Sequence, residues 1–308
     1  MASLETTIGP LKLKTPLMPA SGTFGYGDEY YGLISYEVLG AIVTKSLSLN
    51  PKRGNPPPRI YELPYGILNS IGLENIGIER FLGEKLPLLE KLNLPIVVSI
   101  FGESEQEFLQ VAKRLKTPSI SALEVNLSCP NVKEGGMLFG SSPERVHRII
   151  SLLKDITSLP LWAKLPPDPF HLREIVEAAE KGGADAITLV NTLPAMIIDP
   201  NTGKSLLGGL TGGLSGKALF PVALRMVYEA YKYTNLPIIG AGGLYSGEEA
   251  ISFIIAGASA LQIGSAIFSN PNIFSEVHDY LIEFLKKRNL PDLKMLKGKI
   301  HDMENSAP

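Results

Sequence analysis

Short apolar segments alternate with longer amphipathic segments along most of the chain. The short segments are typical of buried strands, and the longer ones repeat apolar residues at helical spacing, as Phe108, Val111 and Leu115 do. The expected strands are Leu17–Gly22, Ala41–Ser46, Pro95–Ile100, Ala122–Ser128, Leu161–Pro166, Ala186–Thr192, Pro237–Gly243 and Ala260–Ala266. The expected helices cover about Glu105–Leu115, Pro143–Leu153, Leu172–Gly182, Lys217–Lys232, Gly247–Gly257 and Ile273–Lys287.

This alternation predicts a parallel sheet that is covered on both faces. About eight strand–helix units in a chain of 308 residues favour a closed (β/α)8 barrel, the TIM barrel, over a doubly wound sheet. A doubly wound sheet would carry a GxGxxG loop after its first strand, and residues 19–25 lack that spacing. A short hairpin over Thr6–Lys14, turning at Gly9 and Pro10, precedes the barrel. No linker divides the chain, so we expect a single domain over residues 1–308.

Two connections are too long to be simple turns. They run over Leu47–Asn75, which is rich in proline, and Leu193–Gly216, which is rich in glycine. Both follow the carboxyl ends of expected strands, and barrel enzymes build their active sites at that end. We therefore expect long binding loops or lids at the C-terminal face of the barrel.

Composition argues against several classes of protein. The formal net charge of -2 gives no sign of nucleic-acid binding, and no apolar run reaches the ~18 residues that a membrane helix needs. The first residues lack the charged and apolar regions of a signal peptide. A chain with 1 cysteine forms no internal disulfide, which fits a reducing compartment. We therefore expect a cytoplasmic protein that binds neither membrane nor nucleic acid.

The cysteine, Cys129, follows the strand that is expected to end at Ser128. Pro130 stops that strand because proline has no N–H to donate, and Lys133–Gly136 has the composition of a mobile loop. Cys129 is either a small buried hydrophobic residue, as free cysteines often are, or a reactive thiol among polar neighbours. The residue by itself does not distinguish these two roles.

Polar residues gather at the carboxyl ends of the expected strands, which meet at one mouth in a barrel. Lys45 and Lys164 stand out because the strand interiors are interpreted as otherwise apolar. A lysine at such a position either extends to solvent past the rim or belongs to a site, and two lysines beside asparagines favour a site. The strand-end polar residues are Ser21, Lys45, Ser99, Asn126, Cys129, Lys164, Asn191 and Thr192.

Glycines after the last two expected strands indicate a phosphate site. Gly242 and Gly243 lie between a strand and a helix, and Gly264 and Ser265 end the next strand. Glycine lets backbone N–H groups approach a phosphate closely, and barrels usually bind phosphate at these loops. The 4 histidines fall on expected helices or in the tail, so we expect no metal site. The residues by themselves favour a cofactor-dependent enzyme that uses FMN or pyridoxal phosphate.

The order of several motifs resembles dihydroorotate dehydrogenase over nearly the whole chain. These motifs are Thr44–Ser46, Asn69–Asn75, Asn126–Gly136, Val190–Thr192 and the two glycine segments. The resemblance implies an FMN-containing (β/α)8 barrel that oxidises (S)-dihydroorotate to orotate in pyrimidine (UMP) biosynthesis. Cysteine in the Asn126–Gly136 motif implies class 1, and the run after it is most similar to the class 1B catalytic subunit. Such a subunit works with an iron–sulfur flavoprotein that carries FAD and a 2Fe-2S cluster and passes electrons to NAD.

The resemblance also implies a role for each matching residue. Cys129 would be the general base that removes the C5 proton while hydride leaves C6 for FMN. Lys164 would lie near flavin N1, and Lys45 would contact both the flavin and the substrate carboxylate. The implied FMN contacts are Ser21, Lys45, Ser46, Ser99, Asn126, Lys164, Val190, Gly216, Gly242, Gly243, Gly264 and Ser265. The implied substrate contacts are Lys45, Asn69, Ser70, Ile71, Gly72, Leu73, Asn126, Asn191 and Thr192.

One residue departs from the class 1 pattern, because Ser99 stands where asparagine is usual, which leaves the electron acceptor open. The resemblance implies one FMN per chain, homodimerisation of this chain and a heterotetramer with the partner. The alternatives are a class 1A-like enzyme that uses fumarate, another FMN barrel acting on pyrimidines, a flavin-free Schiff-base aldolase or lyase, and a scaffold subunit. We also hypothesise that Lys133–Gly136 closes over Cys129.

Overall fold

The computed structural model describes residues 2–128, 130, 131 and 137–304. The predictions for Cys129 and for the loop Lys133–Gly136 therefore concern residues outside the described part of the chain.

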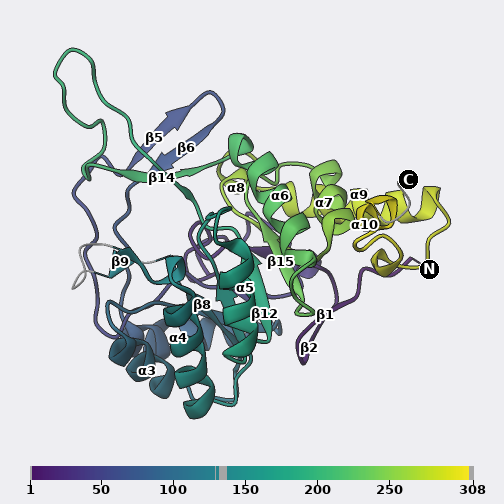
Figure 1. Ribbon diagram of the computed structural model, residues 1–308, viewed down its shortest axis with the longest axis horizontal. Helices are drawn as coiled ribbons and strands as arrows, with labels where there is room; N and C mark the ends of the chain where they lie inside the picture. The colour runs from purple at the N-terminus through teal and green to yellow at the C-terminus, as the bar shows by residue number, and fades with distance from the viewer. Residues whose placement is uncertain (1, 129, 132–136, 305–308) are drawn as a thin grey trace.

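Eight parallel strands form the central sheet, which curves into a nearly closed barrel (Figure 1). The Gly40 N–H donates to the Leu17 carbonyl oxygen at 2.8 Å, so the two ends of the strand order approach each other. The predicted TIM barrel is confirmed. In spatial order the strands are β3 (Leu17–Pro19), β16 (Ala258–Ile263), β15 (Ile238–Ala241), β12 (Ala186–Leu189), β11 (Leu161–Lys164), β8 (Ile120–Asn126), β7 (Ile96–Ile100) and β4 (Ile42–Val43).

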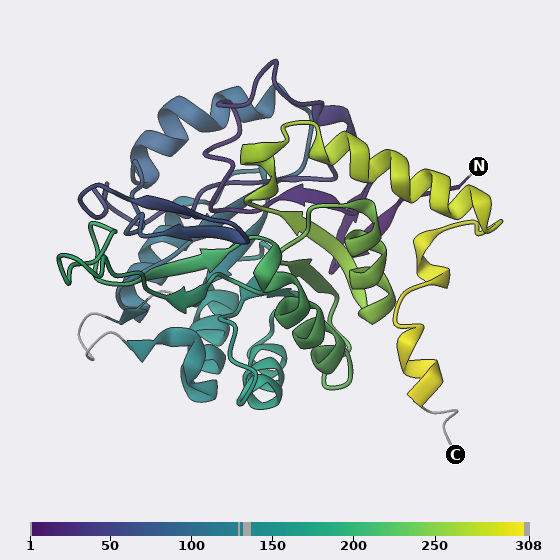
Figure 2. The same ribbon diagram turned by 90° about the horizontal axis from the view of Figure 1, so that it is seen from above.

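Helices surround the strands, as the view from above shows (Figure 2). They begin where the sequence supplies caps: the side chains of Ser104, Ser142 and Ser246 each accept a hydrogen bond from the third residue after them. The predicted helices are confirmed, with ends shifted by a few residues. They are α3 (Glu105–Arg114), α4 (Pro143–Ile156), α5 (Leu172–Lys181), α6 (Phe220–Tyr231), α7 (Gly247–Ala256) and α9 (Ile273–Lys287).

The predicted N-terminal hairpin is also confirmed. β1 (Thr6–Ile8) pairs with β2 (Leu11–Leu13). Ile8 and Leu13 are buried in one cluster with Trp162 and the other small and apolar residues of the barrel interior. The hairpin therefore plugs the amino-terminal end of the barrel, so the opposite end is the one available for a site.

The predicted strands are mostly too long at their carboxyl ends. β3 ends at Pro19 instead of Gly22, β4 at Val43 instead of Ser46, and β12 at Leu189 instead of Thr192. β8, β11, β15 and β16 likewise stop two or three residues early. The chain leaves the ladder there, which frees the polar residues beyond each strand to line the mouth.

The prediction of loops over the two long connections is wrong in part, because both contain strands. β5 (Ile60–Leu63) and β6 (Gly66–Asn69) come from the first connection, and β13 (Leu193–Ala195) and β14 (Gly212–Ser215) come from the second. They form one antiparallel sheet in the order β13-β14-β6-β5. In Figure 1 this small sheet lies at the end of the molecule opposite β1 and β2.

Several helical segments were not expected from the sequence. Residues 78–90 form α1 (Ile78–Arg80), a π-helical turn (Phe81–Lys85) and α2 (Leu86–Glu90). Gly83 and Pro87 interrupt the helical pattern of this segment, and its buried residues Phe81 and Leu89 stabilise it through packing. The remaining short elements are 3-10 turns at Tyr36–Val38, Phe139–Ser141, Lys217–Leu219 and Leu293–Met295, the two-residue strands β9 (Pro130–Asn131) and β10 (Met137–Leu138), and helices α8 (Ala266–Ser269) and α10 (Ile300–Glu304).

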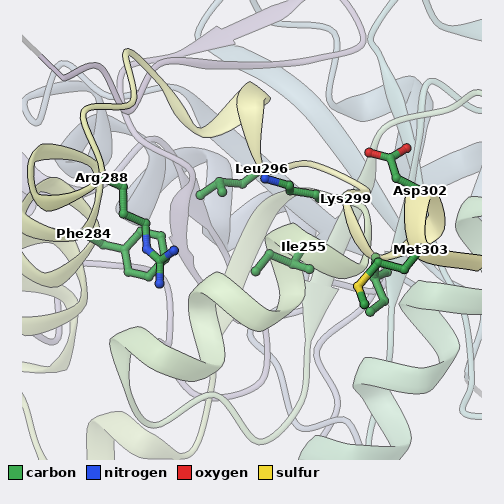
Figure 3. Close-up of a pocket in the computed structure, with 8 residues that line it drawn as sticks. Ile255, Phe284, Arg288, Leu296, Lys299, Asp302 and Met303 are labelled. Atoms are coloured by element: carbon green, nitrogen blue, oxygen red, sulfur yellow. The ribbon is translucent and has the colours of Figure 1, made fainter. Parts of the chain in front are cut away.

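The C-terminal segment packs beside α7 and α9, where it forms one wall of a hollow (Figure 3). Ile255, Phe284 and Met303 give this hollow an apolar lining, and Arg288 and Lys299 also face it. None of the predicted site residues lines it. Within the described residues, no helix combines the length and the apolar character that crossing a membrane requires.

Candidate functional site

The C-terminal mouth of the barrel collects polar side chains from seven of the eight strands or from the residues just beyond them. Lys164 is the last residue of β11, and its side chain is buried in the barrel, with 4% of the residue exposed. Its Nζ donates to Ser21 Oγ at 3.2 Å, to Gln262 Oε1 at 3.0 Å and to Glu124 Oε1 at 3.4 Å. The alternative that Lys164 extends to solvent is therefore wrong. A buried cation fixed by three acceptors lies at the base of the mouth.

A row of hydroxyl and amide groups crosses the mouth beside Lys164. Ser99 Oγ and Ser46 Oγ are 2.8 Å apart, and Asn126 Nδ2 donates to Ser46 Oγ at 3.3 Å. Asn191 Nδ2 in turn donates to Asn126 Oδ1 at 3.2 Å, so four predicted site residues form one continuous row. Such groups both donate and accept hydrogen bonds, which suits a flat ring that carries N–H and C=O groups.

Lys45 lies nearer the surface of the mouth than Lys164. Its Nζ is 3.9 Å from Glu74 Oε2, and Arg59 Nη1 contacts the same oxygen at 2.8 Å. Burial lowers the pKa of the Lys45 ammonium below its ordinary value, and the negative charge of Glu74 partly opposes that shift. Lys45 is therefore a partly buried cation whose counter-charge comes from the predicted substrate loop.

The predicted substrate loop begins at the end of β6 and is fixed by the small sheet. Asn69 Nδ2 donates to the Gly213 carbonyl oxygen of β14 at 3.0 Å. Ser70 is buried, and its hydroxyl accepts from Asn55 Nδ2 at 2.8 Å. Leu73 adopts the left-handed conformation with φ 58°, which costs an L-residue about 1–2 kcal/mol. The chain thus holds a strained loop at the mouth, as binding sites often do.

The predicted phosphate segments follow β15 and β16, two neighbouring strands. Gly243 has φ +73°, and a Cβ there would come within 2.4 Å of the Phe220 backbone nitrogen at the start of α6. At Gly264 the nearest heavy atom to such a Cβ would be 3.5 Å away. The hydroxyls of Ser265 and Tyr245 are 3.0 Å apart, and Lys217 Nζ lies 5.5 Å from the centre of the Tyr245 ring. Glycine backbone, hydroxyl groups and a cation thus occur together here, and this combination suits a phosphate.

Three polar residues inside the barrel were missed at the sequence level. Glu124, Thr188 and Gln262 are each fully buried and join Lys164 in one hydrogen-bonded cluster. The interpretation of the strand interiors as otherwise apolar is therefore wrong. A signal was present, because Glu124 stands two residues before Asn126 and so shares its face of β8. Tyr245, Arg59 and Glu74 at the rim were also missed.

Cys129 comes directly after a segment that belongs to the mouth. The Ser128 backbone N–H donates to Asn126 Oδ1 at 3.2 Å, and the Leu127 N–H donates to the Lys164 carbonyl oxygen at 3.0 Å. The residues before Cys129 are therefore tied to both Asn126 and β11. Val190, Gly216 and Gly242, the remaining predicted FMN contacts, follow β12, β14 and β15 at the same end of the barrel.

Comparisons with known proteins agree with this geometry. A family model described as Dihydroorotate dehydrogenase matches residues 3–285. A relative from Thermodesulfovibrio yellowstonii, named dihydroorotate dehydrogenase B (NAD(+)), catalytic subunit, is 48% identical over 299 residues, which is 97% of this chain and 99% of that protein. A relative of the same name from Caldicellulosiruptor saccharolyticus is 46% identical with the same coverage.

Solved structures show the same similarity. The crystal structure of a DHODH in complex with ferulenol, from Eimeria tenella, is 25% identical in sequence to this chain. It matches with a TM-score of 0.80 and covers 97% of this chain and 88% of that chain. The similarity thus extends over the barrel, the long connections and the predicted motifs.

Proposed function

Because the chain belongs to the dihydroorotate dehydrogenase family, we propose that it is the catalytic subunit that oxidises (S)-dihydroorotate to orotate in pyrimidine biosynthesis. The observation that carries this proposal is the buried Lys164 beside the row of hydroxyl and amide groups at the barrel mouth. This arrangement offers a fixed positive charge and many hydrogen-bonding groups to a flat, polar ring.

The residues present fit FMN. The glycine segments at Gly243 and Gly264, with Ser265, suit the phosphate, and Lys164 and Asn126 suit the polar edge of the ring system. When bound, FMN accepts the hydride that leaves C6 of the substrate. The role of the chain is to place a cation and hydrogen-bond donors where negative charge develops during that transfer. The mouth of the barrel supports the proposal of one FMN per chain.

Other residues at the mouth would bind the substrate. Lys45 would pair with the substrate carboxylate, while Asn69 and the loop after it, together with Asn126, Asn191 and Thr192, would contact the ring. Cys129 would take the C5 proton, because the motif that contains it matches the class 1 family pattern. A thiolate is needed for that step, so the rate should rise with pH as the thiol ionises.

The alternatives from the sequence lose support. The Schiff-base alternative concerned Lys164 or Lys45. Lys164 Nζ already has three partners, one of them the Glu124 carboxylate. Lys45 lacks such a set of partners, so for Lys45 it is the family match that argues against a Schiff base. The family match and the relatives' names also favour the B type over a fumarate-using class 1A enzyme and over other pyrimidine-acting FMN barrels.

The visible absorption spectrum tests the proposal. The purified chain, reconstituted with FMN, should be yellow, and dihydroorotate added without oxygen should bleach it. A protein that stays colourless after reconstitution would exclude the proposed activity. Bleaching that occurs with other dihydropyrimidines but not with dihydroorotate would favour another FMN barrel.

The partner is part of the same proposal. The relatives are named catalytic subunits of an NAD(+) enzyme. We propose that an iron–sulfur flavoprotein with FAD and a 2Fe-2S cluster passes electrons from this chain to NAD, in a heterotetramer built on a homodimer of this chain. The isolated chain should then reduce NAD negligibly, and rapid NAD reduction by the chain alone would contradict the need for a partner. The cytoplasmic location stays a prediction.

The phosphate segment gives a prediction at Gly243. Alanine there should weaken FMN binding by about tenfold or more, because the left-handed φ and the approach to the Phe220 nitrogen would force the backbone away. Titration of the apoprotein with FMN, followed by FMN fluorescence, measures this affinity. Gly83→Ala is the matched control, since Gly83 lies in the segment Phe81–Lys85, away from the mouth, and a Cβ there would have no heavy atom within 4 Å. Equal affinities of the two variants would contradict the phosphate assignment.

The lowered pKa of Lys45 gives a pH prediction. The ammonium form binds the substrate carboxylate, and the fraction in this form falls as pH rises through the Lys45 pKa. Affinity for orotate should therefore begin to fall at a lower pH than it would with a lysine of ordinary pKa. Above the Lys45 pKa, the affinity should decrease by about tenfold per pH unit. Glu74→Gln removes the charge that raises the Lys45 pKa, so the fall should move to still lower pH.

Orotate affinity is measured from the change in FMN absorbance across the pH range in both proteins. Comparing the two proteins at each pH removes the effect of the ligand's own ionisation. An identical pH profile in Glu74→Gln, or one shifted to higher pH, would show that Lys45 does not bind the carboxylate.

A further inference from the structure

Glu124 is a buried acidic residue to which the proposed reaction gives no role. It lies on β8, and its side chain is inside the barrel with 0% of the residue exposed. Such a position is costly for a carboxylate unless partners compensate its charge. The partners of Glu124 therefore indicate its role.

Three donors converge on the Glu124 carboxylate. Lys164 Nζ is 3.4 Å from Oε1, Gln262 Nε2 is 2.5 Å from Oε2, and Thr188 Oγ1 is 3.5 Å from the same Oε2. An ionised carboxylate only accepts hydrogen bonds, so three donors match the charged form. Glu124 and Lys164 are thus a buried ion pair within a satisfied network.

Glu124 and Lys164 lie at different depths below the mouth of the barrel. The strand register places Glu124 opposite Trp162, and it places Lys164 opposite Asn126 at the end of β8. Glu124 therefore lies one layer deeper in the barrel than Lys164. The carboxylate holds the ammonium from below, and the positive end of the pair faces the site.

We propose that Glu124 is a positioning residue that holds the Lys164 ammonium at the base of the flavin site and, by opposing its charge, lowers the midpoint potential of the bound FMN. This inference rests on the proposed function, since it requires FMN at the mouth. The two charges are close and shielded from water, so the carboxylate offsets much of the ammonium's field at the mouth. A lower potential favours the passage of electrons from the reduced flavin to the next carrier.

The central experiment measures the midpoint potential of FMN in the reconstituted full-length chain by anaerobic titration against reference dyes at neutral pH. Glu124→Gln removes the charge and keeps the shape. It should shift the equilibrium toward reduced FMN at least tenfold, which corresponds to about 30 mV for a two-electron couple. Thr188→Val is the matched control, because it removes a donor to the same carboxylate without changing any charge.

A double variant, Glu124→Gln with Gln262→Glu, exchanges the two side chains. The network should tolerate this exchange, because the bond between positions 124 and 262 reverses its direction while Lys164 still donates to both side chains. In the original protein, Lys164 Nζ lies 3.0 Å from the amide oxygen of Gln262. In the double variant, the carboxylate at position 262 would accept hydrogen bonds from Lys164 and from the amide at position 124. The double variant should return the reduction equilibrium to within about threefold of the original protein.

The outcomes separate a charge effect from a structural one. A shift toward reduced FMN in Glu124→Gln, its absence in Thr188→Val and its reversal in the double variant would support the proposal. Equal potentials in all variants, a shift in the opposite direction, or equal shifts in Glu124→Gln and Thr188→Val would overturn it. If Glu124→Gln does not fold, a folded double variant with the original potential supports the proposal, and failure of both to fold overturns it. Failure of the unaltered chain to bind FMN would instead reject the proposed function.

Discussion

Replacement of Cys129 by alanine is expected to slow the reduction of bound FMN by dihydroorotate by about 10²- to 10⁴-fold, the usual contribution of a general base. FMN content should not change, because the flavin contacts proposed above come from other residues. Stopped-flow bleaching of the flavin without oxygen measures the rate constant of this half-reaction directly. The expected pattern is thus a yellow protein that its substrate hardly bleaches.

Cys129→Ser is the matched control for this variant. Serine retains a hydroxyl of similar size but ionises far less readily than a thiol, whose ordinary pKa is ~8.5. The serine variant should therefore be slow at neutral pH and should lack the rise in rate that the thiol shows toward that pKa. An alanine variant that bleaches at the original rate would remove Cys129 from the mechanism.

Replacement of Lys164 by methionine is expected to affect both stability and chemistry. The change leaves the Glu124 carboxylate buried without its cation, and loss of one partner of a buried pair costs about 3–5 kcal/mol. It also removes the positive charge at the base of the mouth, which should slow FMN reduction by about 10²- to 10³-fold. Denaturant unfolding measures the free energy, and stopped-flow bleaching measures the rate.

Two further variants separate these effects. Lys164→Met combined with Glu124→Gln removes both charges, so it should regain most of the lost stability while flavin reduction stays slow. Lys154→Met breaks a comparable contact on the surface, where Lys154 Nζ is 2.7 Å from Asp185 Oδ2, and should cost at most about 1 kcal/mol. A loss for Lys164→Met as small as that for Lys154→Met would show that the pair does not stabilise the barrel interior.

The barrel could be predicted from short stretches of sequence, because it is built from units that each occupy one short stretch of chain. Each strand–helix unit is contiguous, and caps such as Ser142 before Pro143 mark helix starts within a few residues. Strand ends were less predictable, because the polar residues up to Ser46 and Thr192 follow the apolar segments without a proline or glycine to mark the end of the strand. Only the tertiary structure shows that the ladder ends before them. Segment 78–90 was missed for a related reason: Gly83 and Pro87 hide a helix that tertiary packing stabilises.

The small antiparallel sheet at the mouth was not predictable from local pattern. Its contacts join Asn69 to Gly213, which are 144 residues apart, and three of its four strands contain glycine or proline. Such strands carry weak strand signals, and their pairing depends on where the barrel brings the two connections. The sequence nevertheless located both connections at the end of the barrel where the sheet forms.

The sequence alone determined the alternation of elements, the motifs of the family and most of the residues proposed for the site, because these are encoded in contiguous stretches of chain. Only the tertiary structure decided that Lys164 is buried and that its counter-charge is Glu124. That pair, with Gln262, joins strands 40 to 138 residues apart. The reason is physical: a charge buried inside a barrel is stable only with partners from other strands, and closure of the barrel decides which partners those are.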